Sequence, residues 1–279
     1  MRRKVWGKNI LMAKNRSIRK ILPETYQAQG LQRLWRAHSD AVNKALVARW
    51  QPVGQMDTLL KTDLFDEAVS DGLSPLLTSL AKRIFYIDAS FEVHQGAKGR
   101  HPGLQTIRAD VRQLPFANGT FDSIVSNSTL DHFKTLDDIV TSLRELYRVL
   151  RPGGQGILTL DNLANPIILL RNGIPFCLLY WMKIVPYYMG VTLGPYRLQR
   201  FLREVGFKIL DVDTIMHCPR VLAVAMARWM EKHASPKTQK AFLRFLMVFE
   251  HFSRLPTRFF TGHFIAIKVT NTNVLNKVT

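Results

Sequence analysis

Short apolar runs alternate with longer amphipathic segments through the middle of the chain. The apolar runs predict strands over residues 59–63, 84–88, 104–110, 121–127 and 156–161, and each ends in Asp or Asn. The amphipathic segments predict helices over residues 73–81, 91–97 and 136–150, the last with Ile139, Leu143 and Leu146 near helical spacing. Strands and helices in this alternation are typical of an α/β fold, a mostly parallel sheet covered by helices on both faces.

The pattern extends to both sides of this region. Arg151-Pro-Gly-Gly predicts the end of the helix before it, because proline cannot continue a helix and glycine favours its last turn. A helix over 196–204, a strand over 207–216, helices across 220–255 and a closing strand over 262–269 follow. His38-Ser39-Asp40 before AVNKALVARW predicts a helix that is N-capped at that point and packs ahead of the first strand.

The polar residues that end the predicted strands are the first candidates for a site. In open parallel sheets, ligands bind beyond the carboxyl ends of the strands, so these side chains are expected to converge on one crevice. The alternative interpretation is that they only cap the turns in which they lie.

Two stretches give this general pattern a family resemblance. ADVRQLPFANGTFDSIVSN and RVLRPGG, taken together, resemble the class I S-adenosylmethionine-dependent methyltransferases, in particular the type 11 methyltransferase domain. The resemblance implies a Rossmann-like seven-stranded sheet with its last strand antiparallel and helices on both faces. It also implies S-adenosylmethionine as methyl donor, bound over the first, second and fourth strands. The expected organisation is a basic N-terminal helical arm (1–50) and a methyltransferase domain (51–279) with an apolar insertion (163–195) and a basic helical insertion (219–260).

The resemblance places donor contacts on three strand ends. It assigns the ribose hydroxyls to the carboxylate of Asp88, the adenine to Asp110 and its neighbour, and the reacting methyl to the end of the fourth strand. The donor-binding positions that it implies are Asp88, Ala89, Asp110, Val111, Asn127 and Ser128.

The chain departs from the family at LLKTDLFDEAVSDG, where a glycine-rich turn is usual and the first glycine here is Gly72. Four carboxylates in such a turn would repel a phosphate, whereas S-adenosylmethionine carries a sulfonium and an ammonium. We therefore expect Asp63, or Glu67 one turn further on, to receive the methionine ammonium beside Gly72. The alternative is a degenerate core that no longer binds the donor.

Candidate acceptor chemistry follows the fourth strand. Asp131-His132 projects to the substrate side of the crevice, and a histidine near its reference pKa is a reasonable base for a protic acceptor. The opposing interpretation is that His132 only orients its loop. The insertion FCLLYWMKIVPYYMG would line a pocket for a hydrophobic or lipid-linked acceptor, although packing between helices explains its composition equally well.

Charge adds a choice of partners. The net charge is +18, yet residues 51–218 are neutral, because the excess lies in residues 1–50 (12 basic, 2 acidic), in residues 219–260 (8 basic, 2 acidic) and in the tail. Basic and apolar residues together favour contact with an anionic membrane, and the net charge also suits an RNA methyltransferase. A third hypothesis is a non-catalytic binding protein on a decayed methyltransferase core. Neither Cys177 nor Cys218 has metal-ligand spacing, and no metal site is indicated.

No secretory signal and no bilayer-spanning run is expected, since Arg171 and Lys183 interrupt the most apolar region. The sequence therefore predicts a cytoplasmic enzyme, with peripheral membrane contact as the alternative location.

Overall fold

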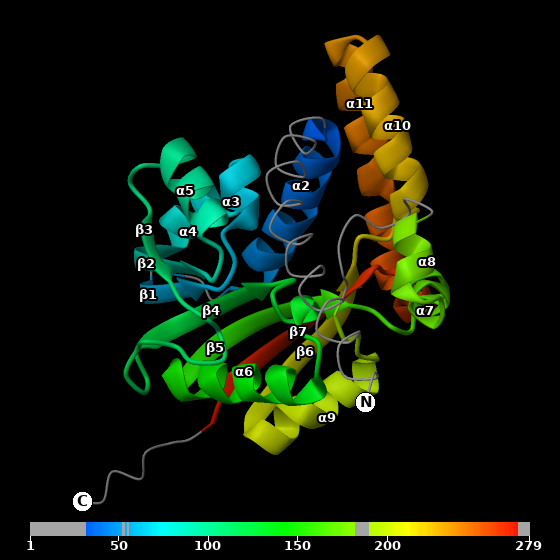
Figure 1. The fold of residues 1–279 in the computed structure, drawn as a ribbon. Helices are drawn as coiled ribbons and strands as arrows, with labels where there is room; N and C mark the ends of the chain where they lie inside the picture. Colours follow the sequence, from blue (N-terminus) through cyan, green and yellow to red (C-terminus); the bar gives the residue numbers. More distant parts are fainter. Residues whose placement is uncertain (1–31, 52–53, 55, 182–189, 273–279) are drawn as a thin grey trace, which may run out of the picture.

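One seven-stranded sheet organises the chain. The computed structural model describes residues 32–51, 54, 56–181 and 190–272. The strand order is β3-β2-β1-β4-β5-β7-β6, and β7 runs antiparallel to both of its neighbours (Figure 1). The strands are β1 (Met56–Lys61), β2 (Ala81–Asp88), β3 (Gln105–Arg108), β4 (Phe121–Asn127), β5 (Leu150–Asp161), β6 (Phe207–Ile215) and β7 (Phe264–Asn271). The expected Rossmann-like sheet with an antiparallel last strand is confirmed.

Helices cover both faces of this sheet, and successive strand residues divide between the two cores. Leu59 and Ile157 pack on one face, whereas Leu60 and Leu158 pack on the other. The first face is covered by α2 (Arg33–Trp50), α3 (Phe65–Val69), α4 (Ser74–Leu80) and α5 (Phe91–Arg100). The second is covered by α6 (Leu136–Val149) and α9 (Pro195–Val205), which lie on the opposite side of the sheet in Figure 1.

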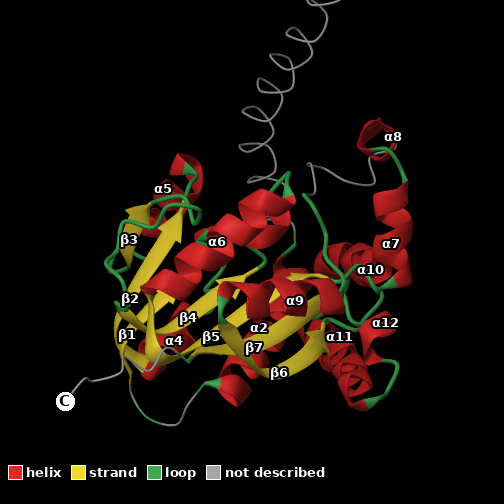
Figure 2. Cartoon of the chain, turned by 90° about the horizontal axis from the view of Figure 1, so that it is seen from below, coloured by secondary structure: helices red, strands yellow, loops and turns green. Residues whose placement is uncertain are grey.

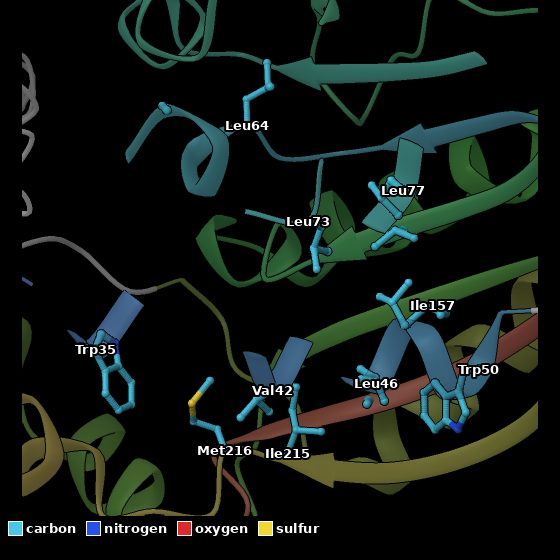
Figure 3. Close-up of a cluster of buried hydrophobic side chains, with 14 of the residues drawn as sticks. Trp35, Val42, Leu46, Trp50, Leu64, Leu73, Leu77, Ile157, Ile215 and Met216 are labelled. Atoms are coloured by element: carbon cyan, nitrogen blue, oxygen red, sulfur yellow. The ribbon is translucent and has the colours of Figure 1, made fainter. Parts of the chain in front are cut away.

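The helix α2 starts earlier than the sequence predicts. Its N-cap is Gln32, so the expected cap at Ser39 and Asp40 is wrong, because both residues lie inside the helix. The reason is tertiary packing: Trp35 is buried in the same cluster as Val42 and Leu46, which lie near β5 and β6 in Figure 3. Burial of these apolar side chains outweighs the local preference of Ser and Asp for a cap.

The segment from β5 to the C-terminus adds helices at one side of the sheet. These are α7 (Pro166–Gly173), α8 (Phe176–Trp181), α10 (Arg220–His233), α11 (Pro236–Val248), η2 (Phe249–Arg254) and α12 (Arg258–Thr261). The antiparallel pair α10 and α11 packs against α2, and α7, α8, α10 and α11 lie on the same side of the sheet in Figures 1 and 2. Among the described residues, none of the helices combines the length and apolar character that crossing a bilayer requires.

Two local differences from the sequence-based expectation concern the start of β5 and the turn after β1. The helix α6 does end before Arg151-Pro-Gly-Gly, but these residues continue into β5, which begins at Leu150 rather than Gly156. The turn after β1 contains the five-residue helix α3, which the sequence did not predict. This additional helix brings the acidic residues of LFDEAV onto the edge of the sheet where the candidate site lies.

Candidate functional site

A cavity of about 300 Å³ opens at the carboxyl ends of β1, β2 and β4 and beside the loop that follows β3. Residues from four successive strand ends or the loops after them line it, as expected for a parallel sheet. Its lining residues are Thr62, Asp63, Ile87, Asp88, Ala89, Ser90, Ala109, Asp110, Val111, Arg112, Thr129, His132 and Phe133. The structure thus brings together Asp63, Asp88, Ala89, Asp110 and Val111, five of the donor-binding positions predicted from the sequence.

Asp63 lies at the start of the loop after β1, and its side chain is half-buried in the cavity wall. Its carboxylate accepts a hydrogen bond from the backbone N–H of Phe65 at 2.5 Å. Burial and the nearby charges of Asp88 and Asp66 raise the pKa of Asp63 to about 8, although the ammonium of Lys61 opposes the shift. This part of the cavity therefore holds more carboxylates than cations, and a positively charged ligand would relieve the imbalance.

Asp88 ends β2, and its carboxylate joins two loops. One oxygen accepts the N–H of Ser90 at 2.8 Å and the other accepts the N–H of Leu64 at 3.2 Å. Each oxygen keeps further lone-pair capacity, so the group can also accept hydroxyl donors from the cavity.

Asp110, beyond β3, is held by Arg112. The guanidinium of Arg112 donates to one Asp110 carboxylate oxygen at 3.1 Å and to the other at 2.6 Å, and it also donates to Asp138 at 2.7 Å. These hydrogen bonds lower the pKa of Asp110, so its carboxylate is ionised across the neutral range.

Glu67 and Gly72 lie outside the cavity, and the structure corrects the role expected for them. Glu67 is fully buried, accepts from the Lys61 ammonium at 2.7 Å and accepts the N–H of Leu73 at 3.0 Å. The Lys61 ammonium also donates to the carbonyl of Asp63. Gly72 has a φ of 52°, and a Cβ there would lie 2.5 Å from a Glu67 carboxylate oxygen. Both residues are therefore part of the scaffold beneath the acidic loop, and of the two residues expected to receive the ammonium only Asp63 lines the cavity.

Asn127 and Ser128 end β4 beside the cavity, but they do not line it. The side-chain oxygen of Asn127 accepts a hydrogen bond from the Thr159 hydroxyl at 2.6 Å, and its side-chain nitrogen donates to Asp66 at 3.5 Å. Ser128 adopts a φ of 50°, and its N–H donates to the backbone carbonyl and hydroxyl of Thr159. These contacts fix the sharp turn after β4, from which Thr129 reaches back to Thr62 at 2.7 Å.

His132 reaches the cavity, whereas Asp131 supports the loop behind it. Burial among the surrounding groups lowers the pKa of His132, and this effect exceeds the opposing influence of Asp161 and Asp88, so the imidazole is neutral at pH 7. Asp131 accepts the N–H of Asp161 at 2.9 Å. Burial, together with the charge of Asp161, raises the pKa of Asp131 well above its usual value.

A second cavity, of about 450 Å³, lies between α7, α8 and the start of the segment after residue 190. Ile174, Pro175, Phe176, Leu179 and Val191 form its apolar lining. Its remaining lining residues are Arg171, Asn172, Gly173, Gly190 and Thr192.

The loop that carries His132 connects the two cavities. The N–H groups of Gly190 and Val191 donate to the carbonyls of Asp131 and Phe133, at 2.8 Å and 2.7 Å. His132 and Phe133 line the first cavity, while Gly190 and Val191 line the second. One short loop thus lines the first cavity and is hydrogen-bonded to a segment that lines the second.

Seven lining residues were not predicted: Thr62, Ile87, Ser90, Ala109, Arg112, Thr129 and Phe133. Each of them is next in sequence to a predicted residue, and a wider window around each strand end would have included them. The pairing of Thr62 with Thr129 joins loops 67 residues apart, and no local pattern indicates it.

The residues present fit the cosubstrate that the resemblance implies. Asp88 and Asp110 offer acceptors for hydroxyl and amino groups, Val111 and Ile87 offer apolar contact, and Asp63 offers a carboxylate for a cation. Within the described part of the chain, no group of His, Cys, Asp and Glu side chains is arranged to hold a metal ion.

Comparisons with known proteins agree with this geometry. A family model described as a methyltransferase domain matches residues 70–158. The demethylmenaquinone methyltransferase of Corynebacterium kroppenstedtii is 33% identical over 82 residues, 29% of this chain and 34% of that protein. The 2-phytyl-1,4-naphtoquinone methyltransferase of Nostoc punctiforme is 29% identical over 150 residues, 49% of this chain and 57% of that protein.

A solved structure extends the likeness of fold beyond the matched segments. Phosphoethanolamine N-methyltransferase 2 of Haemonchus contortus, in complex with S-adenosyl-L-methionine, superposes with a TM-score of 0.54 at 16% identity. The alignment covers 82% of this chain and 52% of that one. The first curated relative is matched over only 34% of its own length.

Proposed function

The chain carries a class I S-adenosylmethionine-dependent methyltransferase domain, and we propose that it transfers a methyl group to an apolar, ring-containing small molecule. The observation that carries the proposal is the cavity in which Asp63, Asp88 and Asp110 meet from three strand ends. S-adenosylmethionine supplies, when bound, a methyl group on a positively charged sulfonium.

The three carboxylates divide the recognition of the donor between them. Asp88 accepts the ribose hydroxyls, and Asp110, kept ionised by Arg112, accepts the adenine amino group. Asp63 pairs with the methionine ammonium and loses its own proton when that cation arrives, because the cation favours the ionised carboxylate. The pair of Lys61 and Glu67 holds the Asp63 loop in place from below.

The second cavity suits the acceptor. Its volume of about 450 Å³ and its apolar lining fit a ring system, and Arg171 and Asn172 offer polar contacts at one side. Two of the relatives are named for quinone substrates, which are apolar rings of this kind. A reduced quinone or a related phenol is the acceptor class that we propose.

His132 takes the proton that the acceptor loses. The acceptor atom gains the methyl group and releases a proton, and the electron pair of the broken carbon–sulfur bond stays on sulfur. A neutral imidazole accepts such a proton, and the lowered pKa of His132 keeps it neutral at pH 7. The position of its loop between the two cavities supports this role.

Transfer of label from methyl-labelled S-adenosylmethionine tests the proposal. We expect label in the organic-solvent extract when the acceptor is a demethylated naphthoquinol, and no label in RNA. Label in RNA would instead favour the RNA methyltransferase hypothesis. Donor binding without transfer to either class would favour a non-catalytic binding protein.

A further inference from the structure

The surface beside the second cavity exposes more large apolar side chains than a solvated face requires. On α7, Ile167 and Leu170 are 58% and 69% exposed, and Trp181 of α8 is 78% exposed. On α10, Leu222 and Trp229 are 65% and 60% exposed. Contiguous exposed apolar side chains of this kind mark interaction surfaces.

These residues lie on neighbouring elements. The start of α7 is tied to the end of α12, because the Asn165 amide donates to the carbonyl of Thr261 at 3.1 Å. The start of α10 is tied to the same region, where Arg220 lies 2.7 Å from His263. Figures 1 and 2 both show α7 on the same side of the sheet as α10, and in Figure 2 α8 lies further from α10 than α7 does. We call this surface the apolar face; it consists of Ile167, Leu170, Trp181, Leu222, Met226, Trp229 and Phe260.

On α10, the apolar face is a stripe with a basic border. Leu222, Met226 and Trp229 recur at helical spacing and are all exposed, while Ala223 and Ala227 face the interior. Arg228 and Lys232 lie on the same exposed side of the helix. An apolar stripe bordered by cations is typical of helices that lie in a membrane interface.

On the α10–α11 hairpin, basic side chains lie on the outer surface, whereas the acidic side chains of this region face the rest of the protein. Its basic side chains Arg228, Lys232, Lys237, Lys240 and Arg244 are exposed, and none forms an ion pair within the described residues.

The acids of this region point the other way. Glu231 accepts the N–H of Leu34 at 2.6 Å, and Glu250 accepts the N–H groups of Met216 and His217 at 3.0 Å. The outer surface is therefore cationic as well as apolar.

We propose that the apolar face and the hairpin cations dock this protein on an anionic lipid bilayer. The charge sign selects anionic headgroups, and the exposed tryptophans place amphipathic rings where such rings favour the lipid–water boundary. RNA would use the cations but would leave Leu222, Met226 and Ile167 in water. Docking does not depend on methyl transfer. Delivery of an apolar acceptor from the bilayer into the adjacent second cavity does rest on the proposed function.

Co-sedimentation of the full chain with phosphatidylcholine vesicles, with and without phosphatidylglycerol, tests the docking. We expect binding to the anionic vesicles and little to the neutral ones. Replacing Lys237, Lys240 and Arg244 by Gln should weaken the binding on the order of 100-fold, since each cation near an anionic surface contributes about 1 kcal/mol.

A second variant separates insertion from charge. Leu222→Gln, Met226→Gln and Trp229→Gln together keep the net charge and should weaken vesicle binding by at least about 10-fold. The matched control is Tyr196→Gln with Leu210→Gln, which removes exposed apolar side chains from α9 and β6 and should bind like the wild type. Circular dichroism and thermal unfolding verify that each variant is folded.

Three outcomes would overturn the proposal: unchanged vesicle binding in both surface variants, equal binding to neutral vesicles, or RNA binding with no vesicle binding. A dimer that the triple apolar variant converts to monomer, without vesicle binding by the wild type, would assign the apolar face to a second copy of the chain. Failure of methyl transfer with intact vesicle binding would reject the proposed function and leave the docking in place.

Discussion

Glu67→Gln is the change that most directly perturbs the scaffold of the acidic loop. Lys61 and Glu67 are both completely buried, with their charged atoms 2.7 Å apart. The substitution keeps the size of the side chain and its ability to accept from Leu73, so the main loss is the negative charge beside the Lys61 ammonium. Burial alone would lower the pKa of Lys61, but the charges of Glu67 and its acidic neighbours outweigh burial and raise this pKa.

The magnitude follows from leaving one buried charge without its partner. Breaking a buried ion pair from one side costs about 3 to 5 kcal/mol, because the remaining charge keeps its desolvation penalty. Asp63 and Asp66 still attract the ammonium, so we expect the lower end, about 3 kcal/mol. Asp57→Asn is the matched control, since its partner Lys82 and Asp57 itself are 60% and 62% exposed, and no measurable change is expected there.

Urea unfolding followed by circular dichroism gives the free energy of unfolding for both variants. The double variant Lys61→Met, Glu67→Gln removes both charges, keeps an acceptor for the N–H of Leu73, and should recover most of the loss because no buried charge is left without a partner. A cost below about 1 kcal/mol for Glu67→Gln, or a double variant as unstable as the single one, would refute the role of this pair in holding the loop.

Three further predictions concern the two cavities. His132→Asn should lower kcat by at least about 100-fold while donor affinity stays within a factor of about two, and retained turnover would remove His132 from the proton transfer. Gly190→Ala should lower turnover more than donor affinity. A Cβ at this position would collide with the carbonyls of Asp131 and Phe133 and push the chain at Gly190 away from the loop that carries His132. Wild-type turnover in this variant would contradict the tight packing. Donor affinity should rise by up to about tenfold per pH unit as the pH increases from about 6 to about 8. The reason is that the cationic donor binds the ionised form of Asp63, whose pKa is about 8 without ligand. Calorimetry across this pH range measures the slope.

The sheet was predictable because its strands are apolar runs that end in polar residues. A parallel strand that is buried on both faces consists mostly of apolar residues. The polar residue at its carboxyl end then faces the crevice in which ligands bind. The pattern places Asp63, Asp88 and Asp110 at strand ends, and the family resemblance supplied the roles expected for Asp88 and Asp110. The start of α2 could not be predicted in this way. Ser39 and Asp40 have a local preference for capping a helix, but the packing of Trp35 in the core outweighs it and extends the helix to Arg33.

The scaffold under the acidic loop could not be predicted from the sequence. Lys61 ends an apolar run and has the sequence context of an ordinary polar residue at a strand boundary, yet it is fully buried and contacts Glu67 six positions away. Which of four clustered carboxylates faces inward depends on the short helix α3, whose five residues carry too little periodicity to be recognised.

Titration of S-adenosylmethionine into the purified full chain by calorimetry tests the central claim, that a carboxylate-lined crevice binds this cationic cosubstrate. We expect one donor to bind per chain, with affinity lowered at least about tenfold by Asp63→Asn and left unchanged by Glu204→Gln on the exposed side of α9. Absence of binding in the wild type, or equal affinity in the Asp63→Asn variant, would contradict it.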